Sequence, residues 1–297
     1  MSTSTFSKPS RPLTWLITGC SSGLGLALAR HIQAQGHKVI ATSRKPSRTP
    51  DLVAEVQSRG GEWYSLDLND PNAAKALIDS IELTGHIIDV LVNNAGSIIF
   101  GAIEQLADEE LHNQMETLYF GPSRLIHALV PCMRTRRFGV VVNISSGAAL
   151  EARESMGGYA AGKAALDASS RVLAKEVAPF NIRILTVWLG TFNTNIGNVS
   201  QFAQGTLPED YRGSVAELTM GAIKSGKLPF DGDTDKAAKA IFEVAVGEGV
   251  GAGREAERFL PLGRDMITRV GLVRDQCTHA LEVFGEVSGN VYIKKQD

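Results

Sequence analysis

Residues 13–25 read LTWLITGCSSGLG, and this stretch decides the fold. An apolar run ends at Ile17, a turn of small residues follows, and apolar residues then recur at helical spacing as far as Ile32. The order is therefore strand, tight glycine turn, helix. The free N–H groups and the positive dipole end at such a helix N-terminus favour a bound diphosphate. We expect Gly19 to permit the turn, Gly23 to let the diphosphate approach the backbone, and Gly25 to let the helix pack on the strand.

The composition is that of an ordinary globular protein. The 297 residues are 43% hydrophobic and 21% charged, with a formal net charge of −2, so no basic excess favours nucleic acid. No apolar run is long enough to span a membrane, and we expect residues 1–12 to be a disordered tail rather than a signal peptide. Cys20, Cys132 and Cys277 lack the spacing of metal ligands, so we expect no metal and reduced thiols in a cytoplasmic protein.

Strand and helix patterns alternate six times between residues 13 and 189. This alternation predicts an α/β fold with a doubly wound parallel sheet in three layers. We expect a single catalytic domain over residues 13–255, with residues 256–297 packed on it as an extension that includes a helix over about 261–283. Ligands of such sheets bind beyond the carboxyl ends of the strands. The turns at Gly19, Ser43, Asp67, Asn94, Ser146 and Gly190 all follow predicted strands, so we expect them to meet at one site.

A second pattern lies in the middle of the chain. Tyr159 and Lys163 are four residues apart, which places both on one face of a helix over about 157–178. A neighbouring ammonium lowers the pKa of a phenol and makes it a usable proton donor. Ser146 follows the fifth predicted strand, where its hydroxyl could donate to a substrate carbonyl oxygen. Each feature alone is common in proteins without such chemistry, but their combination with the glycine turn indicates a catalytic site.

These motifs, taken together, resemble the short-chain dehydrogenase/reductase family. The resemblance is carried, in order, by TGCSSGLG at 18–25, Asp67–Leu68, NNAG at 93–96, NISS at 143–146 and YAAGK at 159–163. It covers roughly residues 13–195 and implies a Rossmann fold. It also implies that Tyr159 is the proton donor or acceptor, that Lys163 tunes Tyr159 and holds ribose hydroxyls, and that Ser146 orients the carbonyl. Subunits of the family usually pair through two long helices, which implies a homodimer or homotetramer.

The turns and the resemblance together give a set of expected cofactor-binding residues. They are Thr18, Gly19, Ser21, Ser22, Gly23, Leu24, Gly25, Ser43, Arg44, Asp67, Leu68, Asn94, Ala95, Gly96, Tyr159, Lys163 and Thr194. The chain departs from the family at two places. Leu118 stands where an asparagine usually helps to hold a proton-relay water. Either the relay is slower or takes another route here, or Leu118 is merely a packing residue. Leu189–Gly190 replaces the usual Pro–Gly.

The end of the second predicted strand bears on the choice of cofactor. An acidic residue at this place binds the ribose 2′-hydroxyl of NAD. Here Ser43 is followed by Arg44 and Lys45, so no carboxylate repels a 2′-phosphate and a guanidinium can pair with one. The sequence therefore favours NADP(H) over NAD(H). The alternative is that Arg44 and Lys45 form only a solvated basic loop.

Apolar residues in the segment after the sixth predicted strand suggest a lid over the substrate. They are Phe192, Phe202, Leu207, Tyr211, Leu218 and Met220. Such a lid predicts a bulky apolar substrate, although these residues could equally form an ordinary helix core. Our leading hypothesis is an NADPH-dependent ketone reductase or the reverse alcohol dehydrogenase. The alternatives are a family member that retains the cofactor site but has a non-redox or weak catalytic role, and a redox-sensing binding protein.

Overall fold

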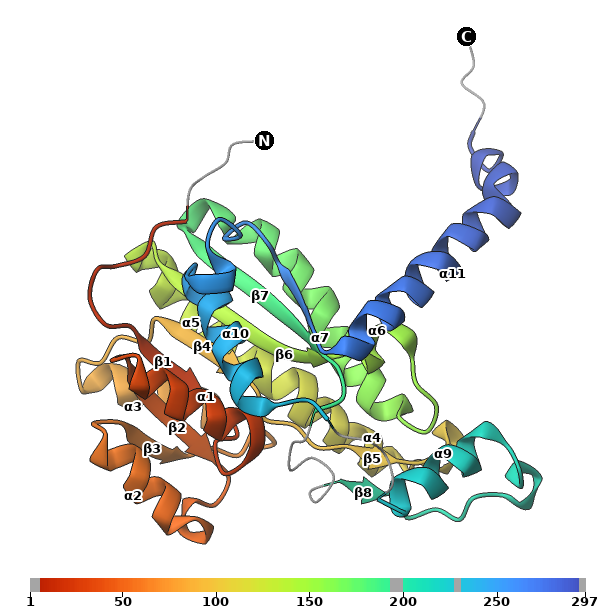
Figure 1. Ribbon diagram of the computed structural model, residues 1–297, viewed down its shortest axis with the longest axis horizontal. Coiled ribbons are helices and arrows are strands. Elements are labelled where there is room, and N and C mark those ends of the chain that lie inside the picture. Colours follow the sequence, from red (N-terminus) through yellow and green to blue (C-terminus); the bar gives the residue numbers. More distant parts are fainter. Residues whose placement is uncertain (1–5, 193–199, 227–230, 294–297) are drawn as a thin grey trace.

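A computed structural model of the chain describes residues 6–192, 200–226 and 231–293. A parallel sheet of seven strands forms its centre, in the order β3-β2-β1-β4-β6-β7-β9 (Figure 1). The strands are β1 (Thr14–Ile17), β2 (Lys38–Ser43), β3 (Glu62–Ser65), β4 (Val90–Asn93), β6 (Gly139–Ser146), β7 (Ile182–Leu189) and β9 (Phe259–Leu262). The predicted doubly wound α/β fold is confirmed.

Helices cover both faces of the sheet because the strands are apolar on both sides. In β1, Trp15 and Ile17 belong to one hydrophobic core and Leu16 to the other. The helices with buried residues in the first core are α1 (Gly23–Ala34), α2 (Pro50–Ser58) and α10 (Thr234–Val246). Those with buried residues in the second are α3 (Ala73–Leu83), α5 (Gly121–Arg136) and α7 (Gly157–Glu176). These two layers hold the carboxyl ends of the strands in place.

Shorter elements complete the described part of the chain. They are the helices α4 (Asp108–Met115), α6 (Ala148–Glu151) and α9 (Val215–Lys224), a π-helical turn η3 (Glu116–Phe120), and the 3-10 turns η1 (Pro46–Arg48), η2 (Ile103–Gln105), η4 (Ala178–Phe180), η5 (Glu209–Tyr211) and η6 (Gly249–Gly251). Strands β5 (Ile99–Phe100) and β8 (Gln201–Phe202) form a separate parallel pair. No helix in the described ranges is long and apolar enough to cross a membrane.

The C-terminal extension differs from the expected helix over 261–283. Residues Phe259–Leu262 form β9, which pairs with β7, and the helix α11 (Arg264–Gly289) begins only afterwards. The strand was missed because it contains Pro261, which cannot donate to a sheet ladder but is tolerated in an edge strand. Helix α11 extends away from the sheet, and its residues from Arg274 onward are exposed (Figure 1). The expected packing of the extension therefore applies to β9 and the first turns of α11 only.

The N-terminal segment also differs from the expected disordered tail. The Phe6 ring lies 5.7 Å from that of Phe138, centroid to centroid. Further along, Arg11 donates two hydrogen bonds, of 2.7 and 2.8 Å, to the buried carboxylate of Asp89. Residues 6–12 thus lie against the domain, because an aromatic ring and a bidentate ion pair hold both of their ends.

Candidate active site

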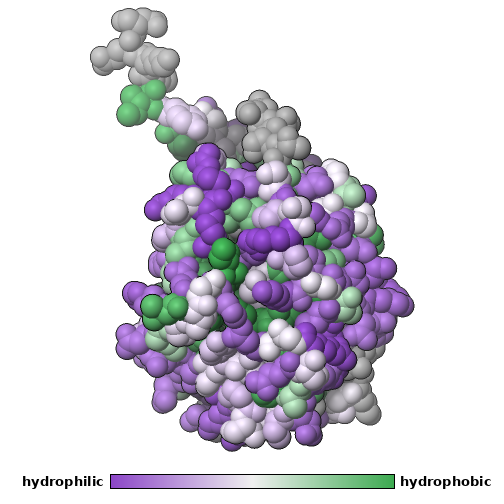
Figure 2. Space-filling model, turned by 90° about the vertical axis from the view of Figure 1, so that its left-hand side faces the viewer, coloured by the Kyte–Doolittle hydropathy of each residue, from purple (hydrophilic) through white to green (hydrophobic). Residues whose placement is uncertain are grey.

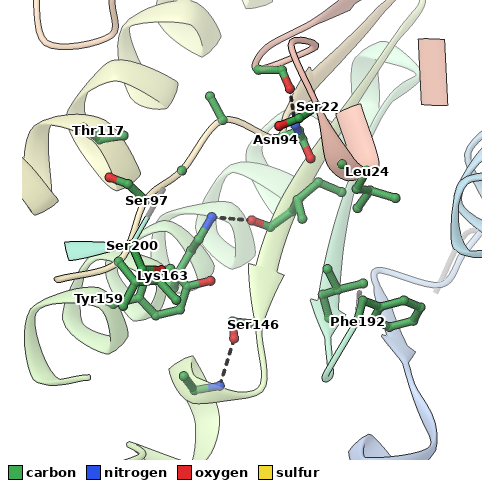
Figure 3. Close-up of a pocket in the computed structure, with 18 of the residues that line it drawn as sticks. Ser22, Leu24, Asn94, Ser97, Thr117, Ser146, Tyr159, Lys163, Phe192 and Ser200 are labelled. Atoms are coloured by element: carbon green, nitrogen blue, oxygen red, sulfur yellow. Dashed lines mark hydrogen bonds between the residues drawn. The ribbon is translucent and has the colours of Figure 1, made fainter. Parts of the chain in front are cut away.

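A cavity of about 770 Å³ opens at the carboxyl ends of the strands, as expected for this fold (Figure 3). Most of the predicted site residues line it. They are Thr18, Gly19, Ser21, Ser22, Gly23, Leu24, Ser43, Arg44, Asp67, Leu68, Asn94, Ala95, Gly96, Ser146, Tyr159 and Lys163. Gly25 lies behind the lining, and Thr194 lies outside the described residues. Residues from distant parts of the sequence therefore meet at one site.

The glycine turn at one end of the cavity has the shape of a diphosphate cradle. Gly19 has a φ of +74°, and a Cβ there would lie 2.9 Å from Cα of Ala95. A Cβ on Gly25 would lie 2.3 Å from the carbonyl oxygen of Gly19. Only glycine fits at both positions. Helix α1 begins at Gly23 without an acidic residue in its first turn, so its N-terminus can accept an anion.

The segment after β4 locks this turn in place. The backbone N–H groups of Asn94 and Ala95 donate to Oγ1 of Thr18 at 2.9 and 3.0 Å. The Asn94 side chain donates to the carbonyl oxygen of Thr18 at 2.8 Å. These bonds join the ends of β1 and β4, so the role of the NNAG segment here is to fix the backbone of the turn.

The end of β2 has one buried and one exposed predicted residue. Ser43 is buried, and its hydroxyl accepts a hydrogen bond of 3.0 Å from the Trp63 indole. Arg44 is exposed and lines the cavity. Asp67, also exposed, follows β3 and accepts a hydrogen bond from the backbone of Asn69. The Arg44 guanidinium is therefore the charged group at the end of β2 that a ligand in the cavity can reach.

At the other end of the cavity lie Ser146, from β6, and Tyr159 and Lys163, from α7 (Figure 3). Tyr159 and Lys163 are 7% and 4% exposed. The Lys163 ammonium donates a hydrogen bond of 2.6 Å to the carbonyl oxygen of Ile144. The Ser146 hydroxyl accepts one of 3.2 Å from the backbone of Ala148. Because a hydroxyl can donate as well as accept, Ser146 keeps its proton for another partner.

Burial dominates the titration of this pair. It raises the pKa of Tyr159 to about 12, and the hydrogen bond with Ser146 opposes the rise. It lowers the pKa of Lys163 to about 8, while the charge of Asp167 opposes the fall. We expected Lys163 to lower the pKa of Tyr159, but burial raises that pKa instead. The ammonium contacts the Ile144 carbonyl and lies 5.9 Å from the centroid of the Tyr159 ring.

Asp167 is a buried acidic residue that sequence reasoning missed. It lies one helical turn beyond Lys163, and its Oδ2 accepts a hydrogen bond of 2.8 Å from the Trp188 indole. Burial raises the pKa of Asp167, whereas the hydrogen bond from Trp188 and the charges of Lys163 and Arg171 lower it. The spacing of four residues after Lys163 was the signal that could have revealed this carboxylate.

Arg269 was also missed, and nothing in the local sequence marks it. It lies on α11 and lines the cavity. Its guanidinium lies 3.4 Å from the carboxylate of Glu151 and 3.3 Å from that of Asp265. Asp265 in turn accepts hydrogen bonds from the backbone and the hydroxyl of Thr191. Only the pairing of β9 with β7 brings this distant part of the chain to the site.

Leu118 lies in the π-helical turn and is fully buried. It shares a small hydrophobic cluster with Tyr159. Its side chain lies so close to Gly96 and Gly162 that a Cβ on either would come within 3.2 and 2.9 Å of it. Leu118 is therefore a packing residue between the NNAG segment and α7, which was one of the two readings of this departure.

Two of the six predicted lid residues, Phe192 and Phe202, line the cavity. Leu207, Tyr211, Leu218 and Met220 do not, and Leu218 is exposed. Within the described ranges, no three His, Cys, Asp or Glu side chains form a group that could hold a metal ion.

The family model for short chain dehydrogenases matches residues 14–204. The chain belongs to this family. The oxidoreductase claN of Passalora fulva is 41% identical to it over 61% of this chain and 83% of the relative. The 3-ketodihydrosphingosine reductase of Bacteroides thetaiotaomicron is 36% identical over 69% of this chain and 73% of the relative. This resemblance is to a family of oxidoreductases that bind a nicotinamide cofactor and act on small molecules.

Solved structures agree with this membership of the short chain dehydrogenases. A short-chain dehydrogenase from Streptomyces avermitilis superposes with a TM-score of 0.84, at 34% identity over 95% of this chain and all of that one. A metagenomic short-chain oxidoreductase solved with NADP is 28% identical over 60% of this chain and 82% of the other, with a TM-score of 0.57. The site described above lies largely within the matched residues, whereas Arg269 lies beyond them.

Proposed function

We propose that this protein is an NADPH-dependent ketone reductase, which also catalyses the reverse oxidation of a secondary alcohol. The observation that carries the proposal is that Ser146, Tyr159 and Lys163 line the same cavity as the glycine turn. A hydroxyl, a phenol and an ammonium at one end and an anion cradle at the other are what hydride transfer from a dinucleotide requires.

The residues present fit the cofactor. The backbone of the glycine turn would hold the diphosphate and Arg44 the 2′-phosphate, while Lys163 would reach the ribose hydroxyls. When bound, the nicotinamide supplies the hydride for the carbonyl carbon. Ser146 donates a hydrogen bond to the carbonyl oxygen, and Tyr159 transfers its proton to that oxygen, which yields the alcohol. Burial keeps the phenol protonated until this step, because it raises the pKa of Tyr159.

The preference for NADPH is supported by the end of β2. Arg44 is exposed at the cavity, and no carboxylate follows this strand before Asp51. The similar metagenomic oxidoreductase was solved with NADP. We further propose that the protein is a homodimer or homotetramer located in the cytoplasm. Light scattering of the purified protein tests the oligomeric state.

Two measurements test the proposed activity. We expect NADPH to raise the unfolding temperature more than NADH does at equal concentration. We also expect NADPH consumption with members of a ketone panel, reduced at least about 100-fold in Tyr159→Phe. The variant should still be stabilised by NADPH, because the substitution removes only the proton donor. Undiminished turnover in Tyr159→Phe would exclude the proposed mechanism.

A further inference from the structure

The half of the cavity that faces a substrate combines apolar and cationic side chains. Its apolar wall consists of Ile98, Phe100, Met156, Phe192, Phe202 and Ile223. Arg153, Lys224 and Arg269 also line this half. Among the described lining residues the single carboxylate is Asp67, which lies at the cofactor end beside Leu66 and Leu68. Residues 193–199 and 227–230, outside the described ranges, contain neither Asp nor Glu.

Two of these three cations have no acidic partner in the described part of the chain. Arg269 is neutralised by Glu151 and Asp265. Arg153 and Lys224, in contrast, form no ion pair within the described ranges. The Lys224 ammonium lies 4.7 Å from the centroid of the Phe202 ring, and Phe202 in turn lies 5.7 Å from Phe100. The positive charge therefore adjoins the apolar wall directly.

The segment that carries Arg153 is fixed to the same wall. The Ser155 hydroxyl donates a hydrogen bond of 3.1 Å to the carbonyl oxygen of Ala216, at the start of α9. Lys224 lies at the other end of that helix. The backbone of Gly101, directly after β5, donates one of 3.0 Å to the carbonyl oxygen of Ser155. Arg153 and Lys224 thus belong to one connected frame rather than to independent loops.

A cation without a counter-charge at the wall of a cavity can bind an anionic ligand, and a guanidinium can hold a carboxylate through two parallel hydrogen bonds. Arg153 is partly buried, whereas Lys224 is exposed at the cavity. We propose that the substrate is a keto acid, with an apolar body against the Phe100–Phe202 wall and a carboxylate bound by Arg153 and Lys224. Identifying this ligand as the substrate rests on the proposed reductase activity. The carboxylate site itself rests only on the residues that line the cavity.

Binding tests the carboxylate site without relying on turnover. We would titrate the protein, with NADP⁺ present, with oxo fatty acids of increasing chain length and with the methyl ester of each, using calorimetry. We expect the best acid to bind about tenfold or more tightly than its ester. Arg153→Gln and Lys224→Gln should each reduce this preference, and the double variant should abolish it while leaving binding of the ester unchanged.

Arg274→Gln provides the control, because Arg274 is exposed on α11 and does not line the cavity. It should bind acid and ester as the unaltered protein does. Equal affinity for acid and ester, a preference that survives the double variant, or no binding throughout the series would each overturn the carboxylate site. Turnover separates the two proposals: preferential binding of the acid without NADPH consumption would contradict the reductase and leave the carboxylate site standing.

Discussion

The ammonium of Lys163 is anchored on the carbonyl oxygen of Ile144, at 2.6 Å, near the end of the neighbouring strand β6. The bond joins the helix that carries Tyr159 to the strand that carries Ser146. It therefore holds the three polar groups of the candidate site in one arrangement. It also costs stability, because the cation is buried.

The cost of burying Lys163 should be visible in the pH dependence of stability. Its pKa is about 8 in the folded chain against the ordinary lysine value of 10.5, so the unfolded chain binds more protons between these limits. The penalty is complete below about pH 8 and disappears above 10.5. We therefore expect the free energy of unfolding of Lys163→Met, relative to the unaltered protein, to fall as the pH rises through this range. Urea titrations at several pH values measure it, and a constant difference would contradict the assignment.

Asp167 should set the alkaline limit of activity. Its charge raises the pKa of Lys163 against the effect of burial, so Asp167→Asn should let Lys163 lose its proton at a lower pH. The alkaline limb of the profile of kcat/KM against pH should shift to lower pH. Trp188→Phe removes only the hydrogen bond to the carboxylate and should shift it less. An alkaline limb that does not move in Asp167→Asn would show that this charge does not act on the site.

Leu118 should be needed for packing rather than for chemistry. It is fully buried in an apolar cluster, so Leu118→Asn should destabilise the fold by about 2–5 kcal/mol, as the lost burial and the unpaired amide both act in that direction. Leu118→Met, similar in volume, should cost less than about 1.5 kcal/mol. Chemical denaturation measures both. If Leu118→Asn kept full stability and turned over faster, the result would show instead that the lack of an amide side chain at this position limits a proton relay in the unaltered protein.

Arg44 should discriminate between the two nicotinamide dinucleotides. Arg44→Gln removes a charge-assisted contact to a 2′-phosphate. We therefore expect the dissociation constant for NADPH to rise about tenfold or more, with little change in that for NADH. Arg48→Gln is the matched control, since Arg48 is exposed in the same loop but does not line the cavity. Dissociation constants from fluorescence titration decide the matter. Parallel losses for both dinucleotides would place Arg44 at another part of the cofactor.

Most of the fold could be predicted because the strands up to Leu189 alternate with helices and end in recognisable turns. The last of these strands, β7, ends at Leu189, where the predicted alternation also ends. In contrast, β9 was not predictable, because Phe259–Leu262 contains a proline and owes its strand conformation to the neighbouring β7. The chain from Asp108 to Arg136 is likewise not one continuous helix, because the π-helical turn that buries Leu118 separates α4 from α5. Such an interruption depends on contacts with Gly96 and Gly162 that no local pattern reveals.

The same distinction holds at the site. Motif spacing could indicate Tyr159, Lys163 and the glycine turn, because their chemistry depends on residues close together in sequence. Arg269 reaches the cavity only through tertiary structure, since β9 must first join the sheet. The direction of the Tyr159 pKa was also out of reach, because it depends on burial that spacing does not report.

The position of Arg269 on α11 has a consequence for how the two halves of the cavity can change. The cradle for the dinucleotide is encoded before residue 204, whereas Ile223, Lys224 and Arg269 come from the chain beyond it. Mutation or recombination in the part of the gene that encodes the chain beyond residue 204 can thus alter this half of the cavity while Ser146, Tyr159, Lys163 and the glycine turn are inherited intact. Chimaeras joined after β7 are accordingly a direct route to redesigned specificity.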